Sequence, residues 1–334
     1  MHVLTCEPKQ EFFRPGEQSI STPTPTVWIL ANAVRNDESN ELPRAKGEKS
    51  LKKQRVRRGG VKHKSKLVGK FSILGNNSAG IKAKKDSLQS VIKSFKNPSC
   101  ITLQETKLPK TSVFKMENHQ VFQKNRNGSG GGLLTAVNPS LNPLLISARN
   151  DEAEILTVQL KCSDANIRVI NAYGPQDDDT QQNKLNFWMG LEEEVLAAKS
   201  ESCMVLIQMD ANAKLGRNII SSDPNLQTDG NGRQMLSLIS RQNLILLNID
   251  RMCTGAITRH RVTKNGTEEA ILDYMLVCEE LYQFFESMII DEAREYTLTK
   301  YATTKGKKKI VKSDHNPMFA IFNVQYSKFQ NFQN

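Results

Sequence analysis

The chain has 334 residues, enough for one large domain or two small ones. Lysine and arginine outnumber the acids by 46 to 35, which gives a formal net charge of +11 and favours a polyanionic partner. No apolar run approaches the roughly 20 residues of a membrane helix, and the N-terminus lacks the basic and then apolar regions of a secretion signal, so the sequence argues against a membrane partner and against secretion.

The six cysteines are scattered along the chain without CxxC spacing, and most of them stand inside apolar runs. Buried, reduced thiols have this pattern. We therefore expect no disulfide partner and an intracellular, reducing location, either nuclear or cytoplasmic.

Residues 1–66 differ in composition from the rest of the chain. They include polar and proline-containing stretches, and between Arg44 and Lys70 the sequence is dense in cations with Glu48 as its one acid. We predict a disordered basic N-terminal arm over 1–66, which is a solvated linker, a nucleic-acid-binding arm or a nuclear localisation signal. Its candidate nucleic-acid contacts are Lys52, Lys53, Arg55, Arg57 and Arg58.

Order begins near Lys70 with a strand, a helix and a second strand, predicted at 71–75, 82–96 and 99–103. Such a crossover unit places Asn77 and Glu105 at the same edge of a sheet. A carboxylate there is a natural ligand for a hard divalent ion.

Three more strands are predicted at 133–137, 155–160 and 167–171. The last leads into Tyr173, whose hydroxyl would face the same edge. Glycine-rich residues 128–132 lack the lysine and following helix of a phosphate loop, so we interpret them as a turn. A helix over 180–199 carries one apolar face, made of Leu185, Trp188, Leu191, Val195 and Leu196.

The strand predicted at 203–209 delivers Asp210 and Asn212, which lie on one side if the extended geometry persists, although Asp-x-Asn is also common in ordinary Asx turns. Asn231-Gly232 precedes a helix, and a strand is predicted after it at 244–248. Asp273 stands inside the apolar run 271–277, where an aspartate is costly to bury unless it is hydrogen-bonded.

Near the end of the sequence, a basic loop at 305–312 leads into Ser313-Asp314-His315 and a predicted buried strand at 318–322. An acid beside a histidine among cations suits a site that handles phosphate, but the pair is weak evidence when taken alone. The candidate nucleic-acid contacts of this loop are Lys307, Lys308 and Lys309.

The predicted strand ends carry six motifs in order: Asn77, Leu103-Gln104-Glu105-Thr106, Asn171-Ala172-Tyr173-Gly174-Pro175, Asp210-Ala211-Asn212, Leu272-Asp273-Tyr274 and Ser313-Asp314-His315. From about residue 70 to 325 this set resembles the endonuclease/exonuclease/phosphatase superfamily. The tyrosine motif and Asn231-Gly232 look most like the apurinic-type endonuclease domains of non-LTR retrotransposons. The resemblance implies an α/β fold, a four-layer α/β/β/α sandwich of two packed β-sheets with outer helices and a site at one rim. We assign 67–325 to this domain and 326–334 to a C-terminal tail.

The resemblance also implies roles for the motif residues. On the metal side, Glu105 would bind Mg²⁺ or Mn²⁺, with Asn77 as polar support and Asp314 as an added ligand. Family members with apurinic specificity often carry an acid or amide at the place of Ala79, so a second metal-side ligand is missing here.

The catalytic set implied by the resemblance is Asp210, Asn212, His315, Asp273 and Tyr173. Asp210 would orient or deprotonate water, and Asn212 would hold the scissile phosphate. His315, oriented by Asp273, would donate to a phosphoryl oxygen. Tyr173 would contact the phosphate or the leaving oxygen.

The function implied is that of a Mg²⁺-dependent DNA endonuclease that nicks one strand and leaves a 3′-hydroxyl, as the target-site endonuclease of a non-LTR retrotransposon does. Two alternatives stay open: a phosphodiesterase of the same fold acting on abasic DNA, RNA or a small phosphodiester, and a decayed nuclease that only binds nucleic acid. The sequence ends without a reverse-transcriptase region, so such a region is an expected partner only if the chain is a fragment of an element rather than a degenerate copy or a host-expressed remnant.

Overall fold

The structure of the protein is a computed structural model. It describes residues 68–126, 130–149, 153–163, 165–304 and 307–327. The chain divides into two units, 1–59 and 60–334, and every described residue belongs to the second unit. The basic arm predicted at 1–66 lies outside the described residues, and with it Lys52, Lys53, Arg55, Arg57 and Arg58.

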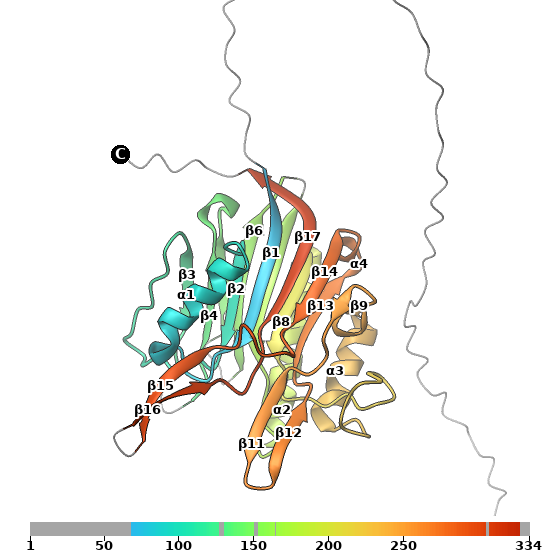
Figure 1. Ribbon diagram of the computed structural model, residues 1–334. Helices are drawn as coiled ribbons and strands as arrows, with labels where there is room; N and C mark the ends of the chain where they lie inside the picture. The colour runs from blue at the N-terminus through green and yellow to red at the C-terminus, as the bar shows by residue number, and fades with distance from the viewer. Residues whose placement is uncertain (1–67, 127–129, 150–152, 164, 305–306, 328–334) are drawn as a thin grey trace, which may run out of the picture. The chain divides into compact units, whose positions relative to one another are not determined.

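Two large sheets form the centre of the second unit (Figure 1). The strands of the first sheet are β1 (Val68–Asn77), β2 (Cys100–Gln104), β3 (Gln120–Lys124), β4 (Leu133–Val137), β10 (Cys253–Thr254), β14 (Phe285–Ile290) and β17 (Met318–Ser327). Their order is β10-β14-β17-β1-β2-β4-β3. The strands of the second sheet are β5 (Leu144–Ala148), β6 (Glu154–Lys161), β7 (Asn166–Tyr173), β8 (Met204–Asp210), β9 (Leu244–Leu246) and β13 (Asp273–Cys278). Their order is β5-β6-β7-β8-β13-β9.

Helices and two hairpins complete the described chain. The α-helices are α1 (Lys85–Ser94), α2 (Gln181–Ser200), α3 (Gly230–Arg241) and α4 (Glu279–Tyr282). Short 3-10 turns are η1 (Lys82–Lys84), η2 (Pro139–Leu141) and η3 (Leu247–Ile249). One hairpin joins β11 (Arg259–Thr263) to β12 (Gly266–Ala270), and the other joins β15 (Thr299–Thr304) to β16 (Lys307–Lys312). None of these helices combines the length and apolarity needed to span a membrane.

The two faces of the first sheet serve different cores. Phe71 and Ile73 of β1 point between the sheets, while the next residue, Leu74, points outward and packs with Leu88 of α1. On the second sheet, Trp188 of α2 belongs to the large core that also fills the space between the sheets. Helices therefore cover the outer faces of two packed sheets, which confirms the predicted four-layer sandwich (Figure 1).

Strand register brings the predicted motif residues to one rim. β1 and β2 pair in parallel, with Asn77 opposite Gln104, as the predicted crossover requires. β7 and β8 also pair in parallel, with Tyr173 opposite Asp210, and antiparallel β13 places Asp273 opposite the same aspartate. Four strands thus end, and one begins, at the same edge of the sandwich.

Three details differ from the sequence-based predictions. Residues 307–312 of the expected basic loop instead form β16, because the adjacent β-branched Ile310 and Val311 favour a strand. β17 runs to Ser327, so Tyr326, which is buried, belongs to the sheet and not to the predicted tail 326–334. Residues 328–334 lie outside the described residues.

The third difference concerns the apolar face of α2. The sequence pattern places Leu185 and Leu196 on that face, yet they are 46% and 51% exposed. The helix packs instead through a stripe centred near Leu191, and at about 100° per residue both leucines stand more than roughly 100° from that centre.

Candidate active site

Two aspartates and a histidine meet at the rim. His315 Nδ1 lies 2.8 Å from Asp273 Oδ2, and His315 Nε2 faces Asp210 Oδ2 at 3.9 Å. All three residues are buried, with at most 5% exposure. The aspartates sit opposite each other on β13 and β8, and an isolated bridge to Arg259 fixes the backbone of His315. The predicted pairing of Asp273 with the histidine is therefore present in the structure.

The electrostatics of this group favour proton handling. Burial, together with the negative charge of Asp273, raises the pKa of the Asp210 carboxyl to about 7. Burial disfavours the His315 cation, but the Asp273 carboxylate outweighs it and the pKa of the imidazole rises to about 9. One ligand atom from each residue lies within 4.8 Å of the others, which is close enough for a metal site. His315 Nδ1 is already hydrogen-bonded to Asp273 and Nε2 faces Asp210, so we interpret the group as a proton-transfer site.

Asn77 and Asn212 hold the Asp210 carboxylate from two sides. Asn77 Nδ2 donates to Oδ2 at 2.7 Å, and the backbone N–H of Asn212 donates to Oδ1 at 3.1 Å. The extended geometry expected after β8 does not persist, because Asn212 has a φ of +46°, in the left-handed region. Asp210 Oδ1 instead accepts from the N–H two residues later, which is an Asx-type turn, and the Asn212 side chain donates to the carbonyl of Gly174 at 2.9 Å.

Glu105 occupies the other side of the rim. The Tyr173 hydroxyl donates to Glu105 Oε1 at 2.6 Å, and the Lys107 ammonium lies 2.8 Å from Oε2. Burial opposes ionisation of this carboxyl, but the hydrogen bonds from Lys107 and Tyr173 prevail and lower its pKa. The backbone φ of Glu105 is +45°, a conformation that non-glycine residues adopt rarely and that often accompanies functional sites.

The donor set on this side fits a hard divalent cation. Glu105 is ionised and also receives a hydrogen bond from Asn77, so two of the three predicted metal-side residues lie together. Asp314 is half-buried, with its carboxylate 3.5 Å from Arg259 Nε. Burial opposes ionisation of Asp314, yet the positive charge of His315 lowers its pKa. Mg²⁺ typically binds one or two carboxylates and keeps several waters, and ionised Glu105 meets that requirement.

Lys84 is a site residue that the sequence analysis missed. It is 3% exposed, and its ammonium donates to the carbonyls of Ser78 and Ala79 and lies 3.3 Å from Ser313 Oγ. Burial and the charge of Lys300 lower its pKa to about 8. A buried cation thus ties the loop after β1 to the loop that carries His315. No pattern distinguishes this lysine from its solvated neighbours in a basic segment.

A buried polar layer beneath the rim was also missed. Gln104 Nε2 donates to Asn171 Oδ1 and to Gln208 Oε1, each at 2.6 Å. Gly75 makes room for this layer, because a Cβ there would lie 2.4 Å from Gln208 Cδ. The layer joins strands of both sheets directly under Glu105 and Asp210. In the sequence, this layer could have been predicted from amides two residues apart from the site residues on the same strand, together with a glycine on the neighbouring strand.

Asn231 and Gln176 extend the site through hydrogen bonds. Asn231, in the first turn of α3, donates to the carbonyl of Pro175 at 2.7 Å and to that of Asn212 at 3.1 Å. Gln176 Nε2 donates to the Tyr173 hydroxyl at 3.1 Å. Burial and the charges of Asp210 and Glu105 raise the pKa of this phenol, so Tyr173 stays protonated and donates to Glu105.

Both hairpins project beyond the end of the sandwich at which the site lies (Figure 1). Lys308 and Lys309 of β16 are exposed there. Lys307 begins the same strand, but its side chain lies outside the described residues. The base of the hairpin lies near the site, because the backbone N–H of Ser313, two residues before His315, donates to the carbonyl of Leu298 at 2.6 Å. The backbone N–H of Thr299 also donates to Ser87 Oγ of α1 at 2.9 Å.

The sequence matches no family model and no curated protein. Among solved structures, the endonuclease domain of TRAS1, a telomere-specific non-LTR retrotransposon, matches with a TM-score of 0.55 at 16% identity, over 75% of this chain and 98% of that one. A 3′-5′ exonuclease from Neisseria meningitidis gives a TM-score of 0.57 at 16% identity, over 76% and 100%. The Xenopus laevis APE2 catalytic domain gives 0.57 at 18% identity, over 78% and 94%. This chain has the endonuclease/exonuclease/phosphatase fold. The resemblance drawn from the motifs is thereby confirmed at the level of the fold.

Proposed function

We propose that the protein is a Mg²⁺-dependent DNA endonuclease that nicks one strand and leaves a 3′-hydroxyl. The observation that carries the proposal is the arrangement of Asp210 and His315, two buried groups that face each other at 3.9 Å. One is a carboxyl with a pKa of about 7 and the other an imidazole with a pKa of about 9. At a pH between these two values, Asp210 is deprotonated and can act as a base while His315 is protonated and can act as an acid, as hydrolysis of a phosphodiester requires.

The chain's own residues then have distinct roles. Asp210 accepts a proton from the attacking water, whose oxygen forms a bond to phosphorus while the bond from phosphorus to O3′ breaks, and the departing O3′ takes a proton from solvent to become the 3′-hydroxyl. His315, oriented by Asp273, donates a hydrogen bond to a phosphoryl oxygen as negative charge develops there. Asn212 and Tyr173 position the phosphate. A bound Mg²⁺, held by Glu105 with Asn77 and Asp314, would supply charge neutralisation at the scissile phosphate.

Charge supports DNA as the substrate. The chain carries a net charge of +11, and exposed Lys308 and Lys309 lie on a hairpin beside the site. Lys307 and the arm residues over 52–58 are further proposed phosphate contacts. A role as target-site endonuclease of a non-LTR retrotransposon, acting in the nucleus with a reverse-transcriptase region, is supported by the motifs and by the likeness to the TRAS1 domain.

The test is a supercoiled-plasmid nicking assay in Mg²⁺ and in EDTA, with Asp210→Asn as the inactive control. Extension of the nicked strand by a DNA polymerase identifies the 3′-hydroxyl. A duplex with one abasic site and a single-stranded RNA serve as parallel substrates. We expect the plasmid to be nicked in Mg²⁺ and to stay intact in EDTA. Cleavage confined to the abasic duplex or to RNA would replace the proposal with the corresponding alternative, and DNA binding without cleavage would indicate a decayed nuclease.

A further inference from the structure

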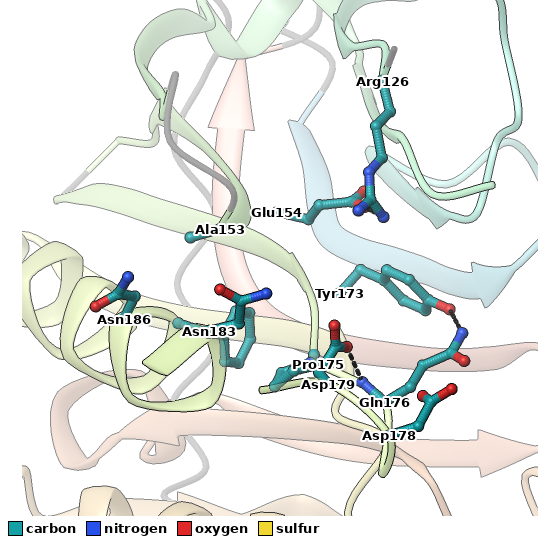
Figure 2. A pocket seen from close by; sticks show the side chains of 12 residues that line it. Arg126, Ala153, Glu154, Tyr173, Pro175, Gln176, Asp178, Asp179, Asn183 and Asn186 are labelled. Atoms are coloured by element: carbon teal, nitrogen blue, oxygen red, sulfur yellow. Dashed lines mark hydrogen bonds and ion pairs between the residues drawn. The ribbon is translucent and has the colours of Figure 1, made fainter. Parts of the chain in front are cut away.

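A cavity of about 310 Å³ adjoins the active site on the Tyr173 side (Figure 2). It lies between Glu154 and Arg126 on one side and, on the other, the loop after β7 and the first turns of α2. Gln176 joins cavity and active site, because it lines the cavity and its amide donates to the Tyr173 hydroxyl. A ligand in the cavity would therefore stand next to a phosphate at the site.

The lining carries more negative than positive charge, in contrast to the basic chain as a whole. Glu154, Asp178 and Asp179 line the cavity, and Arg126 is the cation among the lining residues. Arg126 lies 2.9 Å from Glu154 Oε1 and neutralises that carboxylate. The described lining side chains therefore keep a net charge near −2, which disfavours a phosphate inside the cavity.

The lining is also rich in hydrogen-bond acceptors. Carboxylates accept only, while the amides of Gln176 and Asn183 both donate and accept. Burial raises the pKa of Glu154, but the carboxylate still accepts from the backbone N–H of Gly132 at 2.6 Å. Asn183 is half-buried and points into the space below Glu154 (Figure 2). A neutral ligand that presents several N–H groups matches this surface.

We propose that the cavity binds an unpaired nucleoside beside the scissile phosphate and prefers a base with an exocyclic amino group. The inference rests on the proposed function, which makes a nucleic acid the substrate. A volume of about 310 Å³ is at the lower end of the roughly 300–1,000 Å³ of small-ligand pockets, so it suits one nucleoside and not an oligonucleotide. Nucleobases taken out of the stack are read through amides and carboxylates at their pairing edge. Thymine, with a single N–H donor, matches the lining least well.

The first experiment measures nicking of duplexes that carry one unpaired nucleotide, adenine or thymine, on either side of the mapped cleavage position. The adenine-bulged duplex should be cut at least about fivefold faster, which is the lower limit of discrimination from one good amide contact. Asn183→Leu and Asp178→Asn should each abolish this preference. Nicking of the fully paired duplex should not change, because neither residue belongs to the catalytic group.

Matched controls come from the same segment. Asp177 adjoins Asp178 and is exposed, and Gln181 begins α2, but neither lines the cavity. Asp177→Asn and Gln181→Leu should therefore retain the adenine preference. Circular dichroism of all four variants checks that each is folded. Equal cutting of adenine and thymine bulges by the unaltered protein would overturn the proposal while leaving the nuclease intact.

The second experiment measures binding without catalysis. Adenosine, thymidine and Nα-acetyl-lysine methylamide are titrated into the full chain in EDTA, with NMR detection. Adenosine should bind more tightly than thymidine, and Asn183→Leu should abolish its binding. Tighter binding of the lysine derivative would contradict the assignment of a nucleoside ligand and would indicate that the cavity binds a basic peptide. Adenosine binding without cleavage of any polynucleotide would contradict the proposed nuclease function but support the nucleoside site. If adenosine does not bind and no polynucleotide is cleaved, both the function and the site are wrong.

Discussion

The two sides of the rim differ in how far water reaches them. On the proton-transfer side, the side chains of Asp210, Asp273 and His315 are at most 6% exposed. On the cation side, the Glu105 side chain is 18% exposed and its partner Lys107 is 43% exposed. Burial raises the pKa of Asp210, whereas hydrogen bonds from Lys107 and Tyr173 lower that of Glu105. Two carboxylates at the same rim are thus tuned in opposite directions, Asp210 toward carrying a proton and Glu105 toward carrying a charge.

Loss of the base on the proton-transfer side should have the largest effect. Asp210→Asn keeps the hydrogen-bond acceptor on the chain but removes the group that takes the proton from water. We expect kcat to fall by roughly 10²–10⁴-fold, the usual contribution of general acid–base catalysis. Plasmid nicking under single-turnover conditions measures the change. Near-normal nicking by the folded variant would show that another group accepts the proton.

Loss of the cation side should act through metal binding. Glu105→Gln removes the ionised oxygen, so nicking should fall by more than the roughly 10–100-fold that loss of an outer-shell partner costs. Higher Mn²⁺ concentration should restore part of the activity, and EPR of free Mn²⁺ should show weaker binding. The double variant with Asp210→Asn should lose less than the product of the two single effects, because both residues serve one step. Unchanged Mn²⁺ affinity would place the metal elsewhere.

The pH profile should separate the two groups on the proton-transfer side. Activity should rise through about pH 7 as Asp210 deprotonates and fall through about pH 9 as His315 loses its proton. Asp273→Asn removes a charge that raises both pKa values, so both limbs should move to lower pH. An unchanged profile would contradict the pairing.

The same pair should affect stability. The folded-state pKa of His315 is raised from 6.5 to about 9. The contribution of the protonated imidazole to the free energy of unfolding is therefore complete below pH 6.5 and is lost as the pH rises through 9. The thermal midpoint measured in EDTA should therefore fall over this window, and it should fall less in Asp273→Asn.

Local patterns predicted Glu105, Tyr173 and Asp210, because each stands at or directly after the end of an apolar strand whose direction fixes the rim. Asp273 was the clearest case, since an aspartate in an apolar strand needs a buried partner, and the structure supplies His315. Lys84 was not predictable, because its partners are backbone carbonyls in its own turn and a hydroxyl 229 positions away. The β15–β16 hairpin was misread as a loop, since its lysines conceal the alternation of a strand.

The smallest expected effect concerns the exposed lysines of that hairpin. Lys308→Gln removes one charge that we place on a DNA phosphate, so the plot of log affinity against log salt should become shallower by about 0.9. Affinity should fall alike for all sequences, because phosphate contacts carry no base information. Lys161, exposed at the opposite end of the second sheet, provides the matched control. Lys161→Gln has the same change in net charge, so an equal effect on the slope would mean that general charge, and not the hairpin, attracts DNA. A reduced slope in Lys308→Gln alone, with kcat unchanged, would place the duplex against the hairpin beside the rim and would distinguish phosphate binding there from the chemistry of Asp210 and His315.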